Sequence, residues 1–92
     1  MEFPEASLLA EYAGKYDFGA FMPGGVFTVK AGLGALSVEL TSQPALLVFC
    51  TANDRFEYDV VPAAITFERD TAGKVQALVL HQNGMDMRSP RK

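Results

Sequence analysis

The sequence predicts a mainly β protein, a small antiparallel up-and-down β-barrel of about seven or eight strands with one short N-terminal helix. Short stretches rich in β-branched, aromatic and alternating apolar residues recur along the chain, and turn residues separate them. The connections are short, which favours antiparallel pairing because parallel strands need long crossovers. An open sheet with this many strands has two exposed edges, and closure into a barrel removes them. We therefore expect residues 1–92 to form a single β-barrel domain.

The clearest hairpin lies in the last third of the chain. Residues 65–67 and 75–80 are rich in apolar β-branched and aromatic side chains, and they flank the turn-forming sequence Asp-Thr-Ala-Gly-Lys at 70–74. Gly73 is expected to supply a positive φ, which other residues adopt only at a cost. A second turn, Asn83-Gly84, favours a type I′ hairpin that leads into a last strand over residues 85–89.

The earlier part of the chain predicts one short helix and five strands. Residues 5–12 predict the helix, because Leu8, Leu9 and Tyr12 fall on one side of it and Ala13-Gly14 ends it. Residues 45–50 form an unbroken apolar run, which we interpret as a strand covered on both faces and followed by a turn over residues 51–54. The expected strands in this part are residues 15–18, 26–31, 36–40, 45–50 and 56–59.

The composition argues against several classes of protein. The formal net charge of −3 and the pI near 4.9 argue against nucleic-acid binding, which depends on clustered Lys and Arg. The single cysteine, Cys50, excludes an internal disulfide, and no apolar run approaches the roughly 20 residues that a membrane span needs. The chain as given therefore predicts a cytoplasmic protein without a membrane span, a prediction that does not extend to a fragment of a longer exported protein.

The hydrophobic content is high for a short chain. Hydrophobic residues make up 49% of the 92 residues and the mean hydropathy is +0.10. A domain of this size hides only roughly 60–65% of its unfolded surface, so part of its apolar surface must stay outside a filled core. We expect an internal cavity, an oligomer interface or a missing neighbouring domain.

Several motifs, taken in order, resemble one known family. They are Tyr12-x-Gly14-x-Tyr16, the runs PGGVFTV, LSVEL and QPALLVF, and the segment from Phe67 to Gly84 that ends in His-Gln-Asn-Gly. Together they resemble DUF3471, a small domain at the C-terminus of many serine β-lactamase-like hydrolases, over almost the whole chain. The resemblance implies an eight-stranded lipocalin-like barrel with an accessory role: covering or oligomerising a neighbouring hydrolase domain, or binding something in the barrel mouth. We interpret no part of the chain as the Ser-x-x-Lys motif of the hydrolase domain, so the resemblance implies no catalytic residues.

His81 and Cys50 are the two single residues with obvious chemistry. A histidine that acts as a general base needs a carboxylate and a nucleophile, and nothing in the sequence places Cys50 beside His81. We therefore interpret His81 as a strand residue near a turn and Cys50 as a small buried hydrophobe. One His and one Cys do not make a tetrahedral metal set, and Glu57 and Asp59 share a strand face that is expected to meet water. The sequence predicts no catalytic residue, no metal site and no cofactor.

The aromatic residues and methionines indicate where binding would occur. The interior of an eight-stranded barrel is either filled or holds one small ligand, and at this chain length we expect it to be filled. The leading hypothesis is a non-catalytic accessory or interaction domain, whose partner is a second copy or a neighbouring hydrolase domain. Phe21 and Met22, in the apolar tip Phe21-Met22-Pro23, are its expected interface, either as an exposed patch or folded over the barrel end.

Two alternatives remain. The first is a carrier of a small apolar ligand, and the second is a small hydrolase or isomerase that uses His81 with a carboxylate. For the carrier, the residues expected to line the barrel interior or mouth are Phe27, Phe49, Phe56, Tyr58, Phe67 and Met87.

Overall fold

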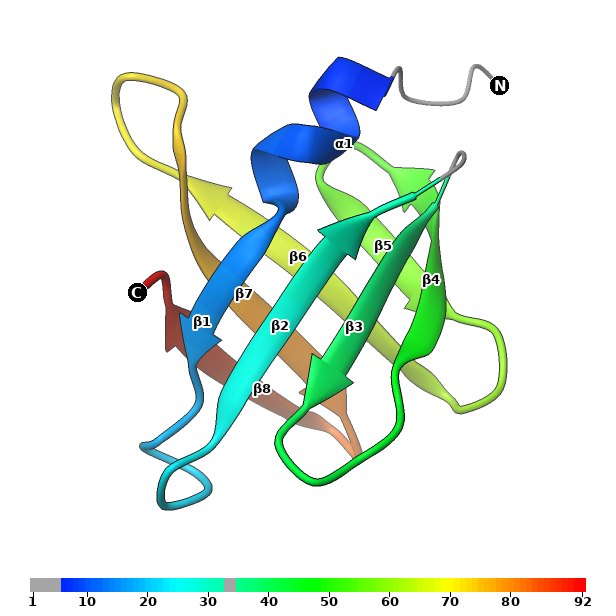
Figure 1. Ribbon diagram of the computed structural model, residues 1–92, viewed down its shortest axis with the longest axis vertical. Coiled ribbons are helices and arrows are strands. Elements are labelled where there is room, and N and C mark those ends of the chain that lie inside the picture. The colour runs from blue at the N-terminus through cyan, green and yellow to red at the C-terminus, as the bar shows by residue number, and fades with distance from the viewer. Residues whose placement is uncertain (1–5, 33–34) are drawn as a thin grey trace.

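The computed structural model describes residues 6–32 and 35–92, which form one short helix and a single eight-stranded sheet (Figure 1). The sheet is antiparallel, and each strand pairs with the next one along the chain, in the order β1 to β8. The predicted helix start at Glu5 and residues 33 and 34, between the predicted strands 26–31 and 36–40, lie outside the described residues. The bounds are α1 Ala6–Tyr12, β1 Gly14–Asp17, β2 Val26–Ala31, β3 Leu36–Leu40, β4 Leu46–Ala52, β5 Arg55–Tyr58, β6 Ala63–Arg69, β7 Val75–Gln82 and β8 Met85–Pro90.

The first and last strands approach each other, so the sheet is nearly closed into a barrel. Tyr16 of β1 forms an isolated antiparallel bridge with Arg91, just beyond β8, and the Lys92 amide donates a hydrogen bond of 2.9 Å to the Lys15 carbonyl. The predicted fold class, a mainly β, antiparallel up-and-down barrel of about eight strands with one short helix, is confirmed. None of the described helices is long and apolar enough to cross a membrane.

The turns explain the order of the strands. Asn83 and Gly84 both have positive φ, 55° and 75°, as a type I′ hairpin requires, and Gly73 has a φ of 85°. These three expectations from the sequence are confirmed. The predicted turn at residues 51–54 is shorter than expected, because Thr51 and Ala52 continue β4 and the chain turns at Asn53 and Asp54.

The outer face of β4 is exposed, which differs from the prediction for this strand. The apolar run at residues 45–50 was expected to be covered on both faces. Val48 is fully buried, but Leu47 and Phe49 are 55% and 42% exposed. A barrel wall is one sheet thick, so alternate residues of β4 face the interior and the rest face outward.

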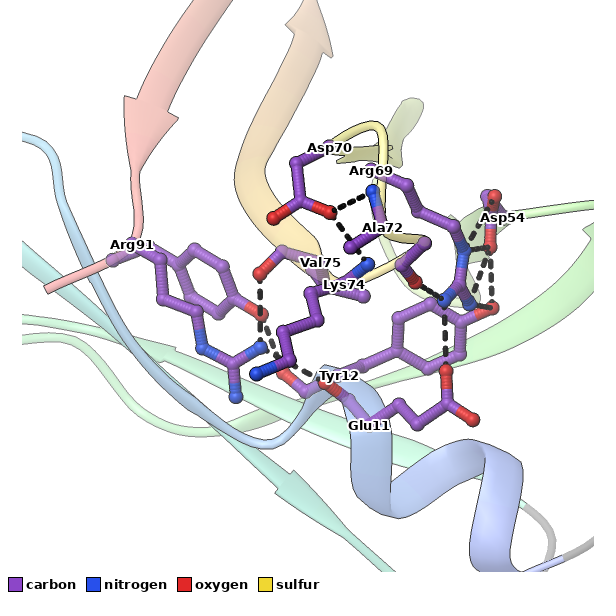
Figure 2. Close-up of polar contacts among 11 residues, drawn as sticks. Glu11, Tyr12, Asp54, Arg69, Asp70, Ala72, Lys74, Val75 and Arg91 are labelled. Carbon is purple, nitrogen blue, oxygen red and sulfur yellow. Dashed lines mark hydrogen bonds and ion pairs between the residues drawn. The ribbon is translucent and has the colours of Figure 1, made fainter.

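Helix α1 closes one end of the barrel, and a charged cluster holds it there (Figure 1, Figure 2). Arg69, the last residue of β6, donates from Nε to both carboxylate oxygens of Asp54, each at 3.1 Å, and from Nη1 to Glu11 of the helix at 2.7 Å. The Tyr12 hydroxyl donates to Asp54 at 2.7 Å. A helix of seven residues is not stable alone, so these contacts and the burial of Leu9 and Tyr12 keep it in place.

The cluster shifts the pKa values of its members. Burial raises the pKa of Tyr12 to about 12, with the hydrogen bond to Asp54 acting in the same direction. Burial alone would also raise the pKa of Asp54, but the hydrogen bonds from Arg69 and Tyr12 outweigh it and hold that pKa below its usual value. Both shifts favour the arrangement in which Asp54 is ionised and Tyr12 is neutral.

Arg91 strengthens the same end from the other side. Its guanidinium lies over the Tyr16 ring, 5.6 Å from the centroid, and donates to the carbonyls of Glu11 and Val75 at 3.0 and 3.1 Å. Gly14 leaves room for it, because a Cβ there would lie 3.1 Å from the Arg91 guanidinium. The seam between the first and last strands is therefore held by side chains as well as by backbone pairing.

Candidate functional site: an apolar pocket at the open end

The barrel is filled at one end and hollow at the other. At the helix end the rings of Tyr12, Phe56 and Phe67 pack against one another, with centroids 4.5–5.8 Å apart. At the opposite end a pocket of about 490 Å³ opens between the loops. The expectation that the interior is filled is therefore right for the helix end and wrong for the open end.

The pocket is bounded by side chains from seven strands, β2 to β8, and three loops. Its walls include Phe18, Phe27, Val38, Leu80 and Met87, all of which belong to or pack against the core cluster. Alternation along the strands turns these residues inward, and α1, the helix of the described residues, lies at the opposite end (Figure 1). The result is a concave site at the open end of the sheet, lined mainly by apolar side chains.

The loop between β1 and β2 forms a lip over the mouth. The amides of Phe21 and Met22 both donate to the Phe18 carbonyl at 3.0 Å, and the Phe21 ring lies 5.3 Å from the Phe18 ring. Gly25 permits this turn, since a Cβ there would lie 2.9 Å from the Met22 carbonyl oxygen. Phe21 lines the pocket and is still 45% exposed. The apolar tip therefore folds over the barrel end and also stays partly exposed, so each of the two expectations for it holds in part.

Three of the residues that line the pocket carry neutral hydrogen-bonding groups: Gln43, Tyr58 and Gln82. Burial raises the pKa of Tyr58 to about 12, so its hydroxyl stays neutral well above physiological pH. Gln43 and Gln82 carry amides, which donate and accept without charge. Most of the lining residues are apolar, and a few polar groups among apolar side chains are typical of small-molecule sites.

The residues expected to bind a ligand lie in three different places. Phe27, Tyr58 and Met87 line the pocket, as do Phe21 and Met22, which were expected at an interface. Phe56 and Phe67 are buried in the filled half beside the helix. Phe49 faces outward from β4, so its expected place in the interior is wrong, because Val48 takes the inward position next to it.

Most of the pocket lining was not predicted from the sequence. Gln43 and Pro44 come from the loop between β3 and β4, Val61 comes from the connection into β6, and Ala63 is the first residue of β6. These four residues carry no signal of their own, because they were expected in breaks between strands. Only the closure of the barrel brings their loops to the same end.

A second group of polar side chains lies on the outer face of β6, β7 and β8. His81 Nδ1 is 2.7 Å from an Asp86 carboxylate oxygen, and His81 Nε2 is 2.8 Å from the Thr66 hydroxyl. A carboxylate and a hydroxyl thus flank His81, whereas Cys50 lies on β4, where its thiol contacts the Ala52 carbonyl at 3.3 Å. The hairpin turn explains the first contact, because pairing around Asn83-Gly84 places His81 opposite Asp86.

This outer cluster has part of the geometry of acyl-transfer catalysis. A nucleophilic hydroxyl also needs hydrogen-bond donors aimed at the developing oxyanion. Thr66 lies inside β6, which pairs with β5 and β7 on its two sides, so the surrounding backbone amides belong to the sheet. We therefore interpret the described cluster as a cross-strand polar network.

Ser89 and Lys92 have the Ser-x-x-Lys spacing, although no such motif was expected in the chain. Ser89 is fully buried on β8, and its hydroxyl has no hydrogen-bond partner among the described residues. Lys92 is exposed beyond the strand end. Residues three apart on an extended chain face opposite sides, so this pair is not a nucleophile with its base.

Comparisons with protein-family models, curated proteins and solved structures found no match for the chain. The DUF3471 resemblance therefore stays a prediction. Among the described residues, no three or more His, Cys, Asp or Glu side chains come close enough together to hold a metal ion.

Proposed function

We propose that the protein binds a small apolar molecule in the open end of its barrel. The observation that carries this proposal is the pocket of about 490 Å³, which lies inside the range of roughly 300–1,000 Å³ that is common for ligand sites. The pocket is open to solvent at its mouth, and its walls belong to or pack against the hydrophobic core of the barrel. The apolar walls and the three neutral polar residues supply the two kinds of contact that such a molecule needs.

The size of the pocket limits the size of the ligand. At roughly 30 Å³ for each non-hydrogen atom, the share that a water molecule takes in the liquid, the pocket holds about 16 atoms. Burying a molecule of that size against apolar walls gives a binding free energy of about −0.3 kcal/mol per non-hydrogen atom, or a more negative one. The total corresponds to a millimolar to micromolar dissociation constant. The expected ligand is a single ring system or a medium-length chain.

The proposal is tested with the apolar dye N-phenyl-1-naphthylamine, whose fluorescence rises on transfer from water to an apolar site. Ala63 lines the pocket on the same side of β6 as Ile65, so Ala63→Phe places a ring in the mouth. Ala52→Phe is the matched control, because Ala52 is exposed at the end of β4 away from the pocket. We expect Ala63→Phe to weaken dye binding by about tenfold or more and Ala52→Phe to leave it unchanged. Equal dye binding by both variants, with folding verified by circular dichroism, would overturn the proposal.

A second candidate is the accessory domain that the DUF3471 resemblance implies, with a second copy of the chain as its partner. Leu47 and Phe49 support it, because they lie two residues apart on the outer face of β4 and are 55% and 42% exposed. Light scattering after size-exclusion chromatography tests this candidate. A dimer that dissociates in the Leu47→Ser, Phe49→Ser double variant would support it, and a strictly monomeric wild-type protein would remove the support.

A further inference from the structure

The charges of the protein are distributed unevenly between the two ends of the barrel. The open end is formed by four connections, residues 18–25, 41–45, 59–62 and 83–84, which contain no Lys, Arg or His. The one charged residue in these four segments is the exposed Asp59, and within one residue of the strand ends on this side lie Asp17, Glu39, Glu57, His81 and Asp86, but no Lys or Arg. The other end carries the cations Lys15, Lys30, Arg55, Arg69, Lys74, Arg91 and Lys92, each within two residues of a strand end on that side.

The pocket lining, like the four connections, contains no Lys, Arg or His. None of the side chains that line it is charged, although Glu39 and Arg88 lie on strands that contribute to it and Asp17 directly precedes the lining residue Phe18. Alternation explains this, because Phe18, Val38 and Met87 take inward positions and their charged neighbours face outward. A ligand in the pocket therefore meets no ionic partner.

We propose that the ligand is uncharged and carries a neutral hydrogen-bonding group, such as an alcohol, ketone or amide, on an otherwise apolar body. This inference rests on the proposed binding of an apolar molecule and adds the polarity of its head group. An anionic group at the mouth would lose water without gaining a cation, and burial of an unpaired charge is strongly unfavourable. An uncharged group can instead pair with Gln43, Tyr58 or Gln82, which hold the neutral donors and acceptors of the site.

Tyr58 is suited to recognise an acceptor on the ligand. It lines the pocket, and its neutral hydroxyl donates one hydrogen bond and accepts others. Tyr58→Phe keeps the ring and removes that donor. We expect this variant to bind an alcohol about three- to tenfold more weakly, the loss of one neutral hydrogen bond.

The experiment compares two ligands that differ only in the head group. Displacement of N-phenyl-1-naphthylamine by 1-decanol and by decanoate at neutral pH measures both affinities in the same protein. We expect wild-type protein to bind decanol at least about tenfold more tightly than decanoate. Equal or tighter binding of decanoate would overturn the inference. Dye binding that neither compound displaces would also overturn it, while leaving the proposed apolar site in place.

A sharper test adds a positive charge to the pocket and asks whether the binding of the anionic ligand improves. Gln82→Lys adds a cation to the pocket at the end of β7, and Gln76→Lys makes the same change at an exposed position near the other end of that strand. We expect Gln82→Lys to tighten decanoate binding by about tenfold and Gln76→Lys to have no effect. No change in decanoate affinity in Gln82→Lys, in a variant that still folds and binds decanol, would contradict the inference. Absence of any dye binding by wild-type protein would instead contradict the proposed function.

Discussion

Arg69 offers the strongest test of what holds the helix over the barrel. Arg69→Ala removes two hydrogen bonds to Asp54, one to Glu11 and one of 2.8 Å to the Gly73 carbonyl. The side chains of Arg69 and Asp54 are only 26% and 20% exposed, so the substitution leaves a largely desolvated carboxylate without its cation. Loss of one partner of such a pair costs more than loss of a surface pair.

The size of the effect follows from a comparison with a second arginine. Arg88 pairs with Glu68 at 2.9 Å, but their side chains are 50% and 39% exposed. Exposed pairs are worth about 1 kcal/mol or less, whereas hydrogen bonds to charged groups with less exposure are worth about 1.5–3 kcal/mol each and are not additive. We expect Arg69→Ala to lower the free energy of unfolding by about 2–4 kcal/mol and Arg88→Ala by less than about 1 kcal/mol.

Urea unfolding, followed by circular dichroism and tyrosine fluorescence, measures both changes. A domain of this size has a total stability of about 5–14 kcal/mol and a urea m-value near 1 kcal/mol per molar. The unfolding midpoint should therefore fall by about 2–4 M in Arg69→Ala and by less than about 1 M in Arg88→Ala. Equal shifts in the two variants would refute the reasoning, because partial burial of the Arg69 cluster would then contribute nothing.

Three further predictions concern the tyrosines, a turn and the outer cluster. The three tyrosines all have raised pKa values, to about 12 for Tyr12 and Tyr58, with burial the largest cause in each case. The folded state therefore holds the tyrosine protons more tightly than the unfolded chain does. Their contribution to the free energy of unfolding is present below pH 10 and is lost as the pH rises toward about 12. A tyrosinate absorbance change with its midpoint near pH 10 in the folded protein would contradict this. Gly73→Ala should cost about 1 kcal/mol in urea unfolding, because a Cβ at φ 85° meets no neighbour within 4 Å and only the backbone conformation is unfavourable; no loss would show that the turn relaxes freely. His81→Gln should lower stability by less than about 1 kcal/mol and leave dye binding unchanged, since Asp86 is 76% exposed and the cluster lies outside the barrel; loss of binding would give the cluster a role that we do not assign to it.

The open end shows how far sequence patterns lead toward a site. Alternation predicts the strand faces of Phe27 and Tyr58, and Met87 was expected at an apolar mouth; each of the three lines the pocket. Phe49 was misplaced because residues 45–50 are all apolar, and a run without a period gives no information about which face is inside. Gln43 and Gln82 were missed because their residue types are typical of exposed turns and strand ends.

The sequence by itself determined the class of the fold, because period-two alternation and turn residues such as Asn83-Gly84 act locally and need no distant partner. Only the tertiary structure decided that Tyr12, Phe56 and Phe67 fill one end while the other stays hollow. An alternating pattern predicts which face of the sheet a side chain occupies. The volume left inside depends on which side chains lie opposite it across the nearly closed barrel. The pairing of Arg69 with Asp54, 15 residues apart in the chain, was decided in the same way, by the register of β5 against β6 and by the docking of the helix.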